Sequence, residues 1–362
     1  MKKCITALLL LFTLSVTSLL ACTSADKPES ATGKTSKTSK SINDKRTDLI
    51  PVTLNEVAHS IFYAPMYVAI EKNYFEKEGI DLSLVTGFGA DKTMTAVLSG
   101  TADIGFMGSE ASIYTYNEGA RDYVVNFAQL TQRAGNFLVA REDIKNFKWE
   151  DLKGRKVIGG RKGGMPEMVF EYILKQNHID PASDLTIDQN IDFGSTAAAF
   201  AEEKADYDFT VEFEPGATNL EKQEKGYVVA SLGTDSGYVP YTAFSAKKSY
   251  ISQHPEIIQG FTNALQKGMN YVASHTPEEI AQVIAPQFKE TTSDTITTIV
   301  SRYYEQDTWK KDLIFRQESF DLLQDILEDA GELRKRAPYK NLVTTIYAEK
   351  SAKAVKDTTL SH

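Results

Sequence analysis

Short apolar runs alternate with amphipathic stretches from residue 49 to about residue 246. The runs are rich in β-branched and aromatic residues and end at glycine or polar turns, which predicts strands, whereas the stretches between them have helical spacing. The predicted strands are 51–57, 81–86, 103–107, 123–131, 137–141, 185–188, 207–211, 227–231 and 242–246. The predicted helices are 63–76, 91–99, 109–118, 165–177, 196–203 and 215–225. Strands that alternate with helices are typical of a parallel sheet, so the pattern predicts an α/β fold.

The second half of this alternating region repeats the character of the first. A new α/β set opens at 151–158. Residues 101–106 (TADIGF) resemble residues 204–209 (KADYDF), because alanine, aspartate and phenylalanine occupy the same positions in both segments. Each of the two segments lies between a predicted helix and a predicted strand. We therefore expect two similar lobes, followed by a mostly helical segment at 255–330 and a polar, frayed tail after Glu349.

The N-terminal part of the chain has a different pattern. Residues 1–21 combine a basic start with an apolar run that ends in small residues, as in a secretory signal peptide. A transmembrane helix is the alternative, but the run is shorter than the ~20 residues that a spanning helix needs. Residues 19–22 (LLAC) resemble the bacterial lipobox, which implies lipidation of Cys22. Residues 22–48 are rich in Ser, Thr and Lys, and this composition predicts a disordered tether.

Composition narrows the possible functions. The formal net charge of −9 makes the chain a poor candidate for binding nucleic acid. Both cysteines, Cys4 and Cys22, lie in or beside the signal peptide, so the mature fold would have no thiol for a disulfide, a metal cluster or a nucleophile. The histidines show no metal-ligand spacing. We predict neither a metal site nor a cofactor, and about 310 residues after the tether suit two lobes.

Four segments, in this order, resemble a large group of ABC transporter substrate-binding proteins. The segments are 73–80 (NYFEKEGI), 98–105 (LSGTADIG), 151–157 (DLKGRKV) and 207–215 (YDFTVEFEP). The group serves nitrate, sulfonates such as taurine, and the pyrimidine precursor of thiamine. The resemblance covers residues 49 to about 330. It implies a type II periplasmic-binding-protein-like α/β fold, in which two lobes joined by two crossing segments enclose a ligand cleft.

The resemblance also implies domain boundaries and partners. The crossings would fall near 141–148 and 236–243. Lobe one is then expected at 49–141 plus 244–348, and lobe two at 142–243. Such proteins close on a small-molecule ligand by a hinge motion and deliver it to an ABC permease with its ATPase subunits. The protein would act as a monomer outside the cytoplasm, anchored to the bacterial cell membrane through the lipid on Cys22.

Ligands of open parallel sheets bind beyond the carboxyl ends of the strands, and four loops of this chain lie there. His59, Phe62 and Tyr63 follow the first strand. Their rings could contact a flat ligand, or they could plug the base of the next helix. Ser109 and Glu110 open a helix whose N-terminus could face a ligand. The simpler interpretation is that Ser109 caps this helix and that Glu110 complements its dipole.

The third loop is glycine-rich. Gly160, Gly163 and Gly164 would let the backbone approach a ligand closely. Their spacing fits neither a P-loop nor the dinucleotide-binding fingerprint. Arg161 and Lys162 could bind an anion, although we expect them to be ordinary surface charges.

The fourth loop follows a predicted strand that ends at Glu212, with Tyr238 and Tyr241 on the return crossing. Glu214 is expected to cap the helix that Pro215 opens. A carboxylate at position 212 would accept hydrogen bonds from an amine and repel a sulfonate or nitrate. The best prediction is therefore a flat, neutral or cationic heterocycle such as an aminopyrimidine. The alternative is a sulfonate, taurine or nitrate anion.

Two further function classes are weaker. The fungal enzyme that makes the thiamine pyrimidine shares the scaffold of this group, but it depends on a cysteine-rich motif and iron, and the mature chain has no internal cysteine. No hydrolase motif surrounds Ser109. An adhesin would show repeats or added binding modules, and the sequence has none. We therefore predict a binding protein and not an enzyme.

Overall fold

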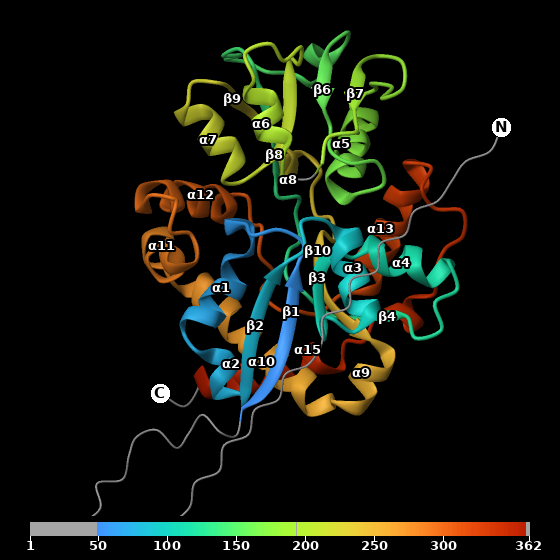
Figure 1. Ribbon diagram of the computed structural model, residues 1–362, viewed down its shortest axis with the longest axis vertical. Helices are drawn as coiled ribbons and strands as arrows, with labels where there is room; N and C mark the ends of the chain where they lie inside the picture. Colours follow the sequence, from blue (N-terminus) through green and yellow to red (C-terminus); the bar gives the residue numbers. More distant parts are fainter. Residues whose placement is uncertain (1–48, 193, 360–362) are drawn as a thin grey trace, which may run out of the picture. The chain divides into compact units, whose positions relative to one another are not determined.

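The computed structural model describes residues 49–192 and 194–359, with side chains up to residue 354. The predicted signal peptide, Cys22 and the tether lie outside these residues. The described residues form two five-stranded sheets with helices packed around each, which confirms the two-lobed α/β fold (Figure 1). None of the helices among them is both long and apolar enough to cross a membrane.

The sheet of lobe one has the strand order β2-β1-β3-β10-β4. β1 (Ile50–Glu56) pairs in parallel with β2 (Ile80–Thr86) and β3 (Ile104–Gly108). β10 (Thr242–Lys247) runs antiparallel between β3 and β4 (Val124–Gln129). All residues of β3 and β4 are buried, as expected for strands covered on both faces. Because β10 comes from far along the chain, lobe one is discontinuous.

The sheet of lobe two repeats this arrangement, with the order β7-β6-β8-β5-β9. β6 (Lys156–Ile158) pairs in parallel with β7 (Thr186–Asp188) and β8 (Phe209–Phe213). β5 (Asn136–Ala140) runs antiparallel between β8 and β9 (Tyr227–Ser231). In both lobes, the antiparallel strand in the fourth place is the strand that directly follows a crossing between the lobes.

The first crossing needs a correction. The strand predicted at 137–141 is β5, which pairs with β8 and β9 and so belongs to lobe two. The chain therefore crosses at 130–135, not near 141–148, and the boundary placed at residue 141 is too late. β5 is buried along its whole length, so its local pattern carries no sign of which sheet it joins. The second crossing, predicted near 236–243, corresponds to residues 236–241, and β10 begins at Thr242.

The helix predicted at 63–76 is divided into three pieces. A 3-10 turn, η1 (Ile61–Tyr63), leads into α1 (Ala64–Glu71), and α2 (Tyr74–Lys77) follows. Asn73 separates the two helices in a left-handed conformation with φ 55°. Pro65 stands in the first turn of α1, where its missing N–H costs no hydrogen bond.

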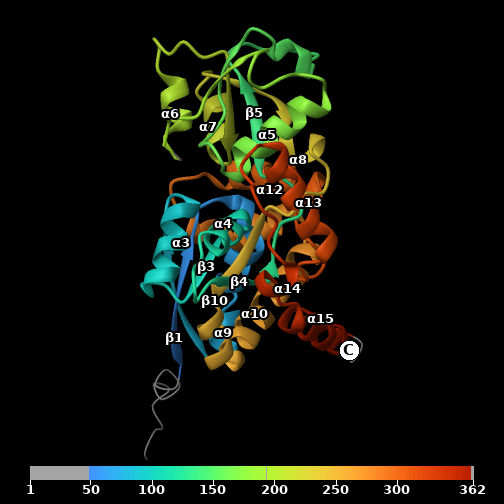
Figure 2. The same cartoon turned by 90° about the vertical axis from the view of Figure 1, so that its right-hand side faces the viewer.

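The remaining helices are distributed over both lobes (Figures 1 and 2). In lobe one they are α3 (Ala90–Ser99), α4 (Glu110–Asn117), α9 (Lys248–Gln253), α10 (Pro255–Ser274), α11 (Pro277–Ile284), α12 (Ser293–Glu305), α13 (Gln317–Asp329), α14 (Tyr339–Leu342) and α15 (Ile346–Thr359), with a 3-10 turn η3 (Ala285–Gln287). In lobe two they are α5 (Met165–Gln176), α6 (Thr196–Ala201), α7 (Gly216–Lys222) and α8 (Leu232–Asp235), with a 3-10 turn η2 (Trp149–Leu152).

Helix α10 holds two parts of lobe one in place. A Cβ on Gly268 would lie 2.1 Å from the backbone oxygen of Pro65, so glycine is needed where α10 approaches α1. On its other side, the Nε2 of Gln259 donates to the backbone oxygen of Tyr347 and to the hydroxyl of Ser351 in α15. The segment after Glu349 continues α15 to Thr359, so the prediction that it frays was wrong for residues 350–359, although its composition is polar, as expected.

The repeated sequence motif marks equivalent places in the two lobes, but with a shift of two residues. The backbone N–H of Thr53 donates to Oδ2 of Asp103 at 2.8 Å, and the N–H of Asp103 donates back to the oxygen of Thr53. In lobe two, the same pair of bonds joins Lys156 and Asp208. The counterpart of Asp103 is thus Asp208 and not Asp206. The lobes share a topology, while the equal spacing of the motif is a coincidence.

Candidate functional site

Three hollows lie where the lobes meet, and the first is a small cavity of about 50 Å³. We call it the Glu110 cavity. Its lining is Val57, Tyr63, Gly89, Ala90, Gly108, Glu110, Arg161, Gly164, Met165, Pro166, Phe213, Tyr241 and Thr242. The strand ends of lobe one, the first turn of α5, the end of β8 and the second crossing all contribute. The cavity is therefore enclosed by both lobes, at the carboxyl ends of the parallel strands.

The second hollow, the Glu212 cavity, has a volume of about 250 Å³. It is lined by Ala58, His59, Ser60, Phe88, Asn136, Gly160, Arg161, Pro166, Ile191, Gly194, Thr196, Ala197, Val211, Glu212, Phe213, Glu214, Pro215 and Gly216. Arg161, Pro166 and Phe213 line both cavities and so stand between them. The two carboxylates that the sequence placed in one cleft, Glu110 and Glu212, thus lie in separate cavities.

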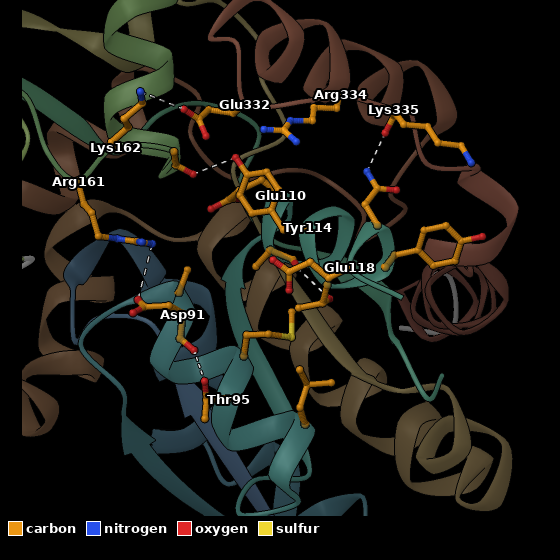
Figure 3. A pocket seen from close by; sticks show the side chains of 18 residues that line it. Asp91, Thr95, Glu110, Tyr114, Glu118, Arg161, Lys162, Glu332, Arg334 and Lys335 are labelled. Atoms are coloured by element: carbon orange, nitrogen blue, oxygen red, sulfur yellow. Dashed lines mark hydrogen bonds and ion pairs between the residues drawn. The ribbon is translucent and has the colours of Figure 1, made fainter. Parts of the chain in front are cut away.

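The third hollow is wide and open, about 1000 Å³, and Figure 3 shows its side chains. It lies between α3, α4, the glycine-rich turn and the segment after α13. It shares Glu110 and Arg161 with the Glu110 cavity. The turn of lobe two is fixed to lobe one here. The hydroxyl of Tyr114 donates to the oxygen of Gly163 at 3.0 Å, and Nζ of Lys162 lies 3.7 Å from Oε1 of Glu332.

Glu110 begins α4 and is buried. Its Oε2 atom has no hydrogen-bond partner among the described residues, and neither has the hydroxyl of Ser109. Ser109 occupies the N-cap position but makes no capping bond, contrary to the expectation for it. Burial raises the pKa of Glu110 to about 7, although the backbone N–H groups of Glu110 and Met165 and the charge of Arg161 oppose the rise.

Glu212, near the end of β8, is also buried, but both of its oxygens are used. The hydroxyl of Thr210 donates to Oε1 at 2.6 Å, and that of Thr196 donates to Oε2 at 2.9 Å. Burial raises the pKa of Glu212 to about 7, with the two hydroxyl groups acting in the other direction. Among the described residues no cation pairs with this carboxylate, and two neutral hydroxyl groups are its side-chain donors.

Glu214 is bound most completely of these carboxylates. It accepts from the backbone N–H and the hydroxyl of Thr218, both at 2.9 Å, so its side chain binds the first turn of α7 as predicted, although the N-cap position belongs to Pro215 and the helix begins at Gly216. In addition, Nη1 of Arg302 in α12 lies 2.8 Å from its Oε1, while Nη2 of Arg302 binds Glu221 at 2.7 Å. The hydroxyl of Ser60 donates to the backbone oxygen of Glu214 at 2.6 Å. Glu214 therefore fastens the lobes together.

His59 lines the Glu212 cavity, but both ring nitrogens are occupied within lobe one. Nδ1 lies 2.8 Å from Oε1 of Glu56, and Nε2 lies 2.9 Å from the backbone oxygen of Gln287. The hydroxyl of Tyr67 donates to the other oxygen of Glu56. The hydrogen bond that His59 donates to Glu56 raises the pKa of His59, against the effect of burial. Two acceptors favour the charged imidazolium, which leaves no free nitrogen for a ligand.

The aromatic residues divide between the core and the cavities. Phe62 is fully buried, with its ring packed against Tyr63, Phe213, Tyr241 and Tyr303. It lines none of the three hollows, so it plugs the helix base. Tyr63 and Tyr241 line the Glu110 cavity, and the hydroxyl of Tyr241 donates to Oδ1 of Asn136.

Tyr238, the other aromatic of the return crossing, lies apart from the three hollows. It is 56% exposed and its hydroxyl donates to Asp307. The guanidinium of Arg133 lies 4.2 Å from the centre of its ring.

The glycine-rich turn serves all three hollows. Gly164 lines the Glu110 cavity, Gly160 the Glu212 cavity and Gly163 the wide hollow. Gly160 and Gly163 have φ of 89° and 75°, which side chains adopt only with strain. Arg161 lines every hollow, and its Nη2 lies 3.6 Å from Oδ1 of Asp91 in lobe one. Arg161 is exposed, as expected for a surface charge, although its side chain also borders the three hollows.

Several lining residues were missed, above all Phe213, Met165, Pro166, Thr196 and Phe88. Phe213 and Met165 could have been found, because each stands next to a residue that had been singled out. Phe88 had a weaker signal, its position between two glycines, and it is 56% exposed at the rim of the Glu212 cavity. No cluster of His, Cys, Asp and Glu side chains within the described ranges could hold a metal ion.

Comparison with known sequences identifies related proteins. A sequence model of the family described as NMT1/THI5 like matches residues 61–280, more than half of the chain. A Bacillus subtilis (strain 168) protein, named "Putative binding protein YtlA", is 46% identical over 302 residues, which are 83% of this chain and 90% of that protein. These relatives carry the names of binding proteins and not of enzymes, in agreement with the prediction.

Solved structures share the fold. The ligand binding component of an ABC-type import system from Staphylococcus aureus, with zinc bound, aligns with a TM-score of 0.66 at 15% identity, covering 83% of this chain and 98% of that one. The alkanesulfonate-binding protein SsuA from Xanthomonas axonopodis pv. citri, bound to MOPS, gives 0.67 at 14% identity, covering 82% and 98%. At these identities the likeness establishes the two-lobed fold.

Proposed function

The chain belongs to the NMT1/THI5-like family, and from this premise we propose that it is the extracytoplasmic solute-binding component of an ABC importer. It captures a small organic ligand between its lobes and delivers the ligand to a permease with its ATPase subunits. The Glu110 cavity lies between the strand ends of two similar lobes, and this position supports it as the site where the ligand is captured. A signal peptide and a lipid on Cys22 would hold the protein, as a monomer, at the outer face of the cell membrane.

The ligand class that fits best is a flat heterocycle with N–H donors on one edge, such as an aminopyrimidine. The observation that carries this proposal is the buried Oε2 of Glu110, which has no hydrogen-bond partner in the described part of the chain and belongs to a side chain that lines a cavity with aromatic walls. A buried acceptor without a donor costs free energy, so a ligand N–H that reaches it gains more than it would in water. The rings of Tyr63, Phe213 and Tyr241 supply apolar faces for the heterocycle.

An anion such as a sulfonate is the second candidate, because Arg161 lines the same cavity and one solved structure of this fold binds an alkanesulfonate. Arg161 is already close to Asp91 and Glu110, however, and above about pH 7, where Glu110 is ionised, its carboxylate would repel a second anion. The heterocycle therefore remains the preferred class.

Thermal shift against a panel of aminopyrimidines, thiamine, riboflavin, taurine, alkanesulfonates and nitrate tests the proposal. A ligand at 100 times its dissociation constant adds roughly 2.7 kcal/mol of stability, which shifts the Tm by several degrees. A shift with an aminopyrimidine that Glu110→Gln removes supports the proposed ligand class. Glu118→Gln is the matched control, since Glu118 is exposed just beyond the other end of the same helix. A shift with a sulfonate or nitrate alone would establish the anion instead.

A further inference from the structure

We propose that Glu110 is a built-in anion: its carboxylate takes the place that the first turn of α5 and Arg161 would otherwise offer to an anionic ligand, and so excludes anions from the Glu110 cavity. This specificity role goes beyond the proposed function. It holds whichever donor-bearing solute the protein captures, because it concerns the groups of the chain itself.

The first observation is the start of α5, which faces the cavity. Helix α5 has twelve residues, and its N-cap is Gly164, which has no side chain to bind the free N–H groups of the first turn. Gly164, Met165 and Pro166 all line the Glu110 cavity. The N-terminus of a helix attracts negative charge. The carboxylate of Glu167, also in this turn, does not line the cavity. Its two oxygens accept from the N–H of Gly163 and from the side-chain amide of Gln189.

The second observation is the carboxylate that lies opposite. Glu110 comes from lobe one, is 2% exposed, and lines the same cavity, and its Oε2 atom has no hydrogen-bond partner within the part of the chain that the structure describes. The backbone N–H of Met165 and the charge of Arg161, both from lobe two, lower its pKa against the larger effect of burial. The groups that would stabilise a bound anion are thus the ones that stabilise Glu110.

The positive charge of Arg161 is already balanced by carboxylates of lobe one. Among the residues that line the Glu110 cavity, Arg161 and Glu110 are the charged ones. Nη2 of Arg161 also lies 3.6 Å from Oδ1 of Asp91, and Figure 3 shows Arg161 reaching from lobe two toward this residue. Two carboxylates of lobe one therefore share one guanidinium of lobe two. An incoming anion would add a third negative charge, whereas an N–H donor would meet the free Oε2.

The proposal predicts that removing the carboxylate exposes an anion site. In Glu110→Ala, acetate or formate should fit the vacated space beside α5 and raise the Tm by roughly 2 °C at ten times its dissociation constant. Wild type should show no such shift. Glu110→Gln should show none either, because its amide fills the space. Sodium chloride at equal ionic strength corrects for general salt effects, and Glu110→Ser is a second variant if the alanine variant does not fold.

Each outcome decides the matter. An acetate-specific shift in Glu110→Ala that weakens in the double variant with Arg161→Gln supports the built-in anion. Equal shifts in wild type and variant, or none in either cavity variant up to 100 mM acetate, overturn it. The test needs no knowledge of the natural solute. If the heterocycle panel fails with wild type while acetate binds Glu110→Ala, the proposed ligand class falls and this inference stands.

Discussion

Two ends of the interface between the lobes contain equally buried carboxylates that are bound in opposite ways. At one end, Glu214 accepts from Thr218 and pairs with Arg302, which also pairs with Glu221. At the other end, Glu110 has an oxygen without a hydrogen-bond partner among residues 49–192 and 194–354, although its side chain is as well shielded from water. Burial alone thus fails to separate a carboxylate that holds the lobes together from one that is open to a ligand. What distinguishes the two carboxylates is the number and charge of the hydrogen-bond donors that each one has.

Glu212 stands between these extremes, with two hydroxyl donors and, in the described ranges, no cation paired with it. The series Glu214, Glu212 and Glu110 therefore orders the carboxylates by decreasing compensation of their charge. This order predicts that removing a partner lowers the free energy of unfolding most at Glu214. Removing the carboxyl charge itself should raise the free energy of unfolding most at Glu110.

The largest effect is expected at the Glu214 end. Arg302→Met leaves the charge of Glu214 buried without its cation, which should lower the free energy of unfolding by about 3–5 kcal/mol. Urea unfolding at pH 7.5 measures the loss. The double variant with Glu214→Gln is the control, because it removes the orphaned charge and should recover a large part of the stability. A loss below 1 kcal/mol would contradict the fastening role of this ion pair.

The pH dependence of stability tests the Glu110 end. Its pKa rises from 4.5 to about 7 on folding, so the folded protein binds the proton more tightly than the unfolded chain does. The free energy of unfolding should therefore fall as the pH rises from about 4.5 to 7. Glu110→Gln cannot lose this proton, and should exceed wild type by on the order of 3 kcal/mol at pH 8 while matching it at pH 4.

Urea unfolding of both proteins at pH 4 and pH 8 gives the four values needed. Glu212 and Glu167, whose pKa values are also raised, contribute equally to wild type and variant and cancel in the difference. A difference between the two proteins that does not change with pH would show that Glu110 does not titrate in this range.

Binding should separate Glu110 from Glu212. A hydrogen bond to a charged group contributes about 1.5–3 kcal/mol, so Glu110→Gln should weaken the bound heterocycle about 10- to 100-fold. Glu212→Gln should change the affinity less than fivefold, since both oxygens of Glu212 are already used in another cavity. Titration calorimetry with the solute found by thermal shift measures both. Equal losses would mean that the ligand spans the two cavities.

Much of the lobe interface could be predicted from the sequence, because local patterns of apolar and polar residues locate the strand ends and the loops that form it. The strand ends, the glycine-rich turn, Glu110, Glu212, Tyr63 and Tyr241 all lie at the lobe interface where the strand–helix alternation put them. Their contact with a ligand stays a prediction. The pattern also predicted the two-lobed α/β class, which depends on alternation over many residues and not on any one position.

The remainder depends on geometry that a local pattern does not contain. Phe62 and Tyr63 are neighbours, but a 3-10 turn rotates successive side chains by about 120°, so one faces the core and the next the cavity. Arg161 lines the cavities because glycines at positive φ turn the chain around it. β5 joined the other sheet through antiparallel pairing with strands far along the chain.

The smallest predicted effect concerns the donors of Glu212. Thr196→Val removes the hydroxyl that donates to Oε2 and keeps the shape of the side chain, so it should cost about 1 kcal/mol at pH 8. The cost should shrink at pH 5, because Glu212, with a pKa of about 7, is then protonated and needs its donors less. Thr95→Val, on the exposed face of α3, is the matched control and should show no such pH dependence. Urea unfolding at both pH values measures the two variants. A cost that is the same at pH 5 and pH 8 would place Glu212 with the fully compensated carboxylates, beside Glu214, and break the order proposed here.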